Sequence, residues 1–194
     1  MKMTELRRAR ETRRPGSVTI AVVLQLLTVI PFVVGILVVL VHGDDAQAAA
    51  EAEIARQGFS PDILARHGIS FGGSEAPAIV LVLVLLALVV LNLAGKRIGR
   101  ILSWIFQPVL FAMGIVIIPG QLFTAQFLAS SFRESGDATL MRIDAQALVD
   151  AAMQAMPAWL TAASAAKLVL TTLGSVFVVV LLALPSARAY FRKA

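Results

Sequence analysis

The sequence predicts an all-α integral membrane protein, a four-helix bundle with both termini cytoplasmic and two helical extracytoplasmic loops. Three observations predict this fold class. Hydrophobic residues make up 58% of the 194 residues and charged residues only 15%, whereas a soluble domain is nearer half apolar. The apolar residues gather into long runs that are almost free of charge. The charged residues lie between those runs, and their sign differs from one segment to the next.

Four apolar runs are long enough to cross a bilayer as helices, because a hydrocarbon core of ~30 Å needs about 20 apolar residues. The predicted spans cover residues 17–41, 77–94, 101–120 and 163–184 of the membrane domain 17–184. A basic arm at 1–16, outer loops at 42–76 and 121–162, and a basic tail at 185–194 complete the chain.

The charge distribution predicts the orientation. The arm, the turn at 95–100 and the tail together hold twelve cations and two acids, while the rest of the chain holds five cations and ten acids. Because basic loops are retained inside, the two termini and this turn are predicted to be cytoplasmic and the protein to be a multi-pass component of the cytoplasmic (inner) membrane. The same asymmetry accounts for the net charge of +5, so the sequence predicts no nucleic-acid partner.

A cleaved signal peptide is the alternative interpretation of the first run. Ala46-Gln47-Ala48 resembles a small-residue cleavage site, and Thr12-Arg13-Arg14 resembles part of a twin-arginine export signal. Signal peptides have apolar regions of only about 7–15 residues, shorter than the run at 17–41. A membrane span is therefore the favoured interpretation.

Both outer loops carry helical signals. In the first, a helix is expected over 45–57, capped by Asp44 or Asp45 and ended by Gly58, followed by a short helix from Ser60-Pro61-Asp62.

In the second loop, Asp137 is expected to cap a helix that runs to about Met156, before Pro157. Residues 121–132 either extend the third span or lie on the outer surface. The similar lengths of the two loops suggest two parallel span–loop–span units, and whether the halves are a true repeat is left open.

Within the spans, five residues are predicted to mediate helix contacts. Gln25 and Gln107 carry amides that need a partner in lipid, and Gly114 permits close approach of another helix. Pro31 and Pro108 each remove a backbone hydrogen bond, which membrane helices tolerate when they are packed.

Three residues are predicted to anchor the bundle at the membrane surface. Trp104 follows the basic turn and Trp159 precedes the fourth span, where indole rings favour the interface. Lys167 lies about one turn inside the fourth span, from where its long side chain can reach outward to water.

No residue pattern points to catalysis, a cofactor or a metal ion. The chain has no cysteine, which excludes disulfides, Cys-ligated zinc, Fe–S clusters and a Cys nucleophile. A cation site made of His42 and His67 with Asp44, Asp45 and Glu75 is conceivable, but these side chains are more simply solvated. The sequence therefore predicts no catalytic, cofactor-binding or metal-binding residue.

The basic turn carries a family resemblance. Gly95-Lys96-Arg97-Ile98-Gly99-Arg100 runs directly into Ile101-Leu102-Ser103-Trp104. Together with the acidic helical loop after the first span, this layout resembles small four-span integral membrane proteins of actinobacteria. The resemblance implies the same fold and no catalytic residues.

These observations favour a non-enzymatic accessory or scaffold subunit of a membrane complex, whose partners are the lipid bilayer and either other membrane proteins or further copies of itself. One alternative is a small transporter or channel component acting as a homo-oligomer, with Gln25, Gln107 and Thr171-Thr172 lining the pore. Another is a membrane enzyme acting on lipid through Asp44 and Asp45. The specific partner and any transported solute are left open.

Overall fold

The computed structural model describes residues 14–73 and 75–193, and this part of the chain consists of helices joined by turns and loops, without a strand. Four helical segments are long and apolar enough to cross a membrane. This confirms the part of the prediction that the protein is all-α and has four such helices. They are α2 (Gly16–Arg56), α4 (Ala76–Leu93), α5 (Arg97–Leu122) and the segment Leu160–Ala183.

Helix α2 is the longest element, with 41 residues, and it packs against α4, α7, α8 and α9. The expected break after the first span is wrong, because α2 continues unbroken past Asp44 and Asp45, which lie exposed on its surface. The close packing of the returning loop against α2 keeps the helix continuous here, despite the helix-capping preference of Asp44 and Asp45. At Gly43 the returning loop passes so closely that an added Cβ would lie 3.2 Å from the Gly72 Cα.

The fourth span consists of α8 (Leu160–Val169), one π-helical turn (Leu170–Gly174) and α9 (Ser175–Ala183). It ends at Leu184, where the backbone becomes extended with ψ of 148°. The basic tail then forms a further helix, α10 (Pro185–Lys193). Ala187 and Phe191 of α10 are buried against the bundle.

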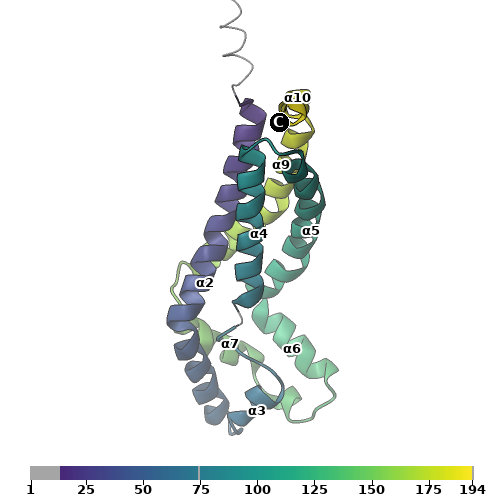
Figure 1. Cartoon of the computed structure of the whole chain (residues 1–194). Helices are drawn as coiled ribbons and strands as arrows, with labels where there is room; N and C mark the ends of the chain where they lie inside the picture. The colour runs from purple at the N-terminus through teal and green to yellow at the C-terminus, as the bar shows by residue number, and fades with distance from the viewer. Residues whose placement is uncertain (1–13, 74, 194) are drawn as a thin grey trace, which may run out of the picture.

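A second unit, here called the helical cap, lies beyond one end of the bundle (Figure 1). It consists of residues 43–56 of α2, α3 (Asp62–Arg66), α6 (Thr124–Glu134), a 3₁₀ turn (Leu140–Arg142) and α7 (Ala145–Gln154). The cap has its own core, formed by Ala46, Ala50, Ile54, Ile63, Leu64, Phe132, Leu140, Ile143, Ala145, Leu148 and Ala152. Because α2 belongs to both units, the bundle and the cap share one continuous helix.

The second outer loop differs from the expected single helix over 137–156. Asp137 caps only the 3₁₀ turn, with its Oδ1 accepting from the Thr139 N–H at 2.7 Å, and this hydrogen bond lowers the pKa of Asp137. The chain is extended at Ile143, and Asp144 then caps α7 by accepting from the Ala147 N–H at 3.0 Å. The break has a packing reason, because Leu140 and Ile143 are both buried in the cap core.

Residues 121–132 do not simply extend the third span, because most of them belong to a separate helix, α6. Helix α5 ends at Leu122, the backbone turns at Phe123 with φ of −117° and ψ of 38°, and α6 begins at Thr124. Figure 1 shows α6 leaving the axis of α5 toward the cap.

The described basic segments meet at the other end of the bundle (Figure 1). The Ser17 and Ser186 hydroxyl oxygens, from α2 and α10, are 3.1 Å apart. The Tyr190 hydroxyl of α10 donates to the Leu93 carbonyl at 2.9 Å, and Arg14 Nη2 donates to the same carbonyl at 3.4 Å. The start of α2, the α4–α5 turn and α10 therefore form one basic end, opposite the cap.

The turn between α4 and α5 depends on two glycines. Gly95 adopts a φ of 70°, which side-chain-bearing residues rarely adopt. Gly99 is packed against the end of α4, where an added Cβ would lie 2.6 Å from the Leu91 Cβ and 2.8 Å from the Leu91 carbonyl carbon.

We predict that Gly99→Ala destabilises the protein by about 1–3 kcal/mol, because the added methyl group meets backbone that cannot move aside without shifting α5. Gly120→Ala is the matched control in the same helix, since nothing lies within 4 Å of its added Cβ. Thermal unfolding in mild detergent should show a lower Tm for Gly99→Ala only. Equal Tm values for the two variants would contradict this packing.

Candidate functional site

Three polar side chains from three spans meet inside the bundle. Gln25 of α2, Asn92 of α4 and Ser103 of α5 are all 0% exposed. Asn92 Nδ2 donates to Gln25 Oε1 at 3.1 Å and to Ser103 Oγ at 2.8 Å, while Gln25 Nε2 donates to Ser103 Oγ at 3.3 Å. Each group thereby finds a partner that lipid cannot supply.

This polar contact gives the sequence-predicted Gln25 its partner helices. Ser103 was not singled out by the sequence, and its only signal is a small hydroxyl residue one helical turn after Gly99. The close packing at Gly99 brings this part of α5 against Asn92 and its neighbours. Two buried oxygens in the described residues, Asn92 Oδ1 and Ser175 Oγ, have no hydrogen-bond partner.

A second close helix contact lies deeper in the bundle, at the π-helical turn of the fourth span. An added Cβ on Gly114 of α5 would lie 2.7 Å from Thr171 Oγ1. Thr171 is buried and donates its hydroxyl proton to the Lys167 carbonyl at 2.8 Å. The wide turn thus presents a threonine where α5 has no side chain, so the two helices approach closely.

The three remaining predicted contact residues differ in how far their side chains are exposed. Gln107 lies on the same face of α5 as Ser103, one turn further along, and is 2% exposed. Pro31 lies within α2 and is half-buried, whereas Pro108 lies within α5 and faces outward. Pro108 therefore makes no large helix contact inside this chain.

The three predicted interface residues occupy both ends of the bundle. Trp104 lies exposed near the basic end, with the Arg100 Cζ 5.2 Å from its ring centroid. Trp159 is exposed where the fourth span begins. Lys167 is half-buried and turns toward the protein, with its Nζ donating to Gln121 Oε1 at 2.7 Å and lying 5.3 Å from the Phe32 ring centroid.

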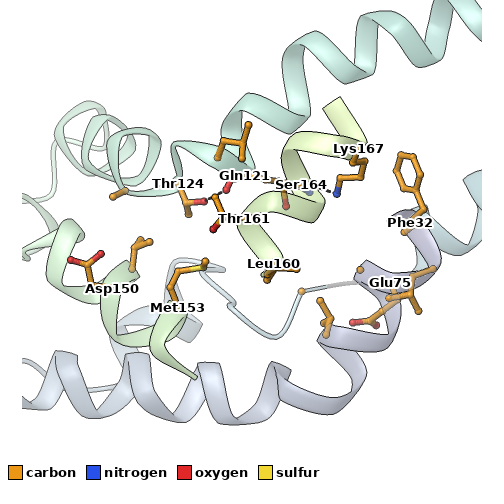
Figure 2. A pocket seen from close by; sticks show the side chains of 18 of the residues that line it. Phe32, Glu75, Gln121, Thr124, Asp150, Met153, Leu160, Thr161, Ser164 and Lys167 are labelled. Carbon is orange, nitrogen blue, oxygen red and sulfur yellow. Dashed lines mark hydrogen bonds between the residues drawn. The ribbon is translucent and has the colours of Figure 1, made fainter. Parts of the chain in front are cut away.

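A cavity lies where the bundle joins the cap, and Lys167 lines it (Figure 2). Its volume is about 590 Å³, within the range of small-molecule sites. Helices α2, α5, α6, α7 and α8 all contribute to its walls. No prediction from the sequence pointed to a cavity here, because its walls come from both outer loops and from all four spans.

The cavity has a polar side and an apolar side. Gln121, Thr124, Gln126, Thr161 and Ser164 provide amide and hydroxyl groups, and Phe32, Ile36, Val39, Met153 and Leu160 provide apolar surface. Two carboxylates, Glu75 and Asp150, also line it. Figure 2 places Asp150 at the end far from Lys167, and Glu75 on the α2 side near Phe32.

The charged groups here suit the binding of a ligand better than the binding of a metal. The described residues contain no cluster of three or more His, Asp or Glu side chains that would hold a metal ion. They also place no carboxylate within 4.0 Å of Lys167, because the carboxylates found at that distance from a basic side chain are Glu53, beside Arg56, and Asp137, beside His67.

We predict that the Gln25 and Asn92 side chains contribute to stability in an energetically coupled way. Asn92→Leu removes two hydrogen bonds and leaves two buried polar groups short of a partner, so it should destabilise the protein by about 1 kcal/mol. Gln25→Leu should cost a similar amount, and the double variant less than the sum of the two. Thr172→Val is the control, because its hydroxyl bonds only within its own helix.

The measurement is thermal unfolding of the single and double variants in the same detergent. Strictly additive losses of unfolding free energy for Asn92→Leu and Gln25→Leu would contradict the coupling.

Function has to be argued from this geometry and not from relatives. Comparison with protein-family models, with curated proteins and with solved structures finds no match to this chain.

Proposed function

We propose that the protein is a non-catalytic accessory or scaffold subunit of a complex in the cytoplasmic membrane, with its basic end inside and its helical cap outside. Its partners are the lipid bilayer and other membrane proteins or further copies of itself. Kinship with the four-span proteins of actinobacteria is part of the same proposal. The observation that carries the proposal is the rigid connection between bundle and cap.

That connection rests on α2, which runs for 41 residues through both units. Its first half packs in the bundle core through Val18, Ala21 and Val22, and its last turns pack in the cap core through Ala50 and Ile54. A subunit that holds a folded module at a set place beside the membrane needs such a connection, because a flexible linker would let the module drift.

The charge pattern supports the proposed orientation. Lys96, Arg97, Arg188 and Arg192 are exposed at the basic end, where positively charged segments are retained on the cytoplasmic side. The cap end carries most of the acidic residues.

The alternative of a pore between copies receives no support from three of the four side chains assigned to it, and the fourth, Thr172, is half-buried with its hydroxyl bonded within its own helix. Gln25, Gln107 and Thr171 are at most 2% exposed within a single chain. Their polar groups are turned into the protomer, so they would not line a channel formed between protomers.

We predict that single cysteines will label according to this orientation. The chain has no native cysteine, so Ser60→Cys in the cap and Lys96→Cys at the basic end each give one exposed site. In intact cells, a membrane-impermeant maleimide should react with the cysteine at position 60 only. After permeabilisation, both should react. Labelling of position 96 alone in intact cells would reverse the orientation.

We also predict that partner contacts can be captured on two exposed faces. A photo-crosslinking amino acid at Phe127 of the cap, 56% exposed, or at Val116 of α5, 70% exposed, should give an adduct of fixed mass in native membranes. The same probe at Leu148, which is 0% exposed, is the control and should give none.

A second, differently tagged copy of the chain distinguishes self-association from another partner. A protein that forms no adduct at either exposed position and purifies as a monomer without companions would overturn the proposed role.

A further inference from the structure

We propose that the cavity between the bundle and the helical cap binds an amphiphile with an anionic head group and an acyl chain, the head at Lys167 and the chain along the apolar wall. The inference does not depend on the proposed scaffold role. It rests on the surroundings of Lys167, on the lining of the cavity and on its position.

The first step is the charge of Lys167. An ammonium group has three donors, and the one hydrogen bond found for Lys167 Nζ goes to Gln121 Oε1. The Phe32 ring adds a cation–π contact. Among the described residues no carboxylate lies within 4.0 Å to neutralise the cation. A cation in a spanning helix is costly, and a missing counter-ion points to a functional role.

The second step is the direction of the side chain. A lysine that only anchors a span would extend toward water at the membrane surface. Lys167 lies roughly 12 Å along the helix from Trp159. Figure 2 shows its ammonium group beside Phe32 and toward Gln121, on the wall of the cavity. The cation is thus presented to whatever occupies the cavity.

The third step is the rest of the lining. Hydroxyl groups of Thr161 and Ser164 lie on the same helix as Lys167 and provide further donors for an anionic head group. Phe32, Ile36 and Val39 form a continuous stripe on α2 that suits an acyl chain. Combining charge at one place with an apolar wall selects an amphiphile over a free anion.

The position of the cavity agrees with this ligand. It lies where the apolar spans give way to the cap, and in a bilayer crossed by these spans that end would be the depth where the head groups of lipids meet their chains. Phosphate and carboxylate heads share the chemistry that Lys167 recognises, so a phospholipid and a fatty acid are both members of the proposed class. The Glu75 carboxylate on the cavity wall repels any bound anion, so removing its charge should strengthen binding.

The test is equilibrium binding of pyrene-labelled phosphatidylglycerol to the purified full-length chain in nonionic detergent, followed by fluorescence polarisation. Unlabelled competitors separate the possible sources: phosphatidylglycerol, palmitate, uncharged diacylglycerol and inorganic phosphate. We expect one of the two acyl anions to compete well, and diacylglycerol and inorganic phosphate to compete poorly. Equal competition by diacylglycerol or by inorganic phosphate would overturn the proposal.

Variants test the residue assignment. Lys167→Met keeps the apolar stem and should weaken binding about tenfold or more, because it removes a charge-assisted contact, whereas Lys167→Arg should retain most of the affinity. Glu75→Gln should tighten binding about twofold by removing an opposing charge. Arg66→Met, an exposed cation on α3 away from the cavity, is the control and should change nothing.

The opposite changes in affinity expected for Lys167→Met and Glu75→Gln keep the test decisive if one of the two variants does not fold. Should Lys167→Met fail to fold, tighter binding by Glu75→Gln still supports the assignment. Unchanged affinity in both Lys167→Met and Glu75→Gln, or no saturable binding to the native chain, would overturn it.

Discussion

The requirement that polar groups inside lipid find partners within the protein shapes the interior of this bundle near its basic end. Gln25, Asn92 and Ser103 satisfy it jointly except at Asn92 Oδ1, and so bind three of the four spans to one another through side chains. Apolar contacts alone would hold these helices with little preference for register, because lipid tails are as apolar as leucine. The hydrogen bonds add that preference, since a shift of one helix would separate all three groups.

Close approach of the backbones is the condition for this arrangement. Gly99 lets the start of α5 lie against the end of α4, and Gly114 lets the middle of α5 lie against the π-helical turn of the fourth span. The side of α5 that faces its neighbours carries the small residues Gly99, Ser103 and Gly114 interspersed with the larger Gln107, Leu110 and Ile118, whereas Ile105 and Val116 face away. The cavity begins beyond these contacts, where α5 gives way to α6 and the helices spread toward the cap.

The sequence was sufficient to predict the four spans, because long uncharged runs have few alternatives to membrane helices. It also indicated that Gln25 and Gly114 belong in helix contacts. It did not identify Ser103 as a partner, since pairing between helices depends on their relative register, which no single span encodes. The break at Ile143 and the uninterrupted passage of α2 through Gly43 were missed for a similar reason. In both places burial in the cap core outweighs the local capping signals.

The continuity of α2 has a mechanical consequence. Measured along its axis, a helix of 41 residues is roughly 60 Å long, and one end lies in the bundle while the other lies in the cap. Spans tilt to match the thickness of the surrounding bilayer, and a tilt of about ten degrees moves the far end of such a rod by roughly 10 Å. Because the cap shares α2 with the bundle, a change in the tilt of the bundle within a bilayer would displace the cap sideways with it.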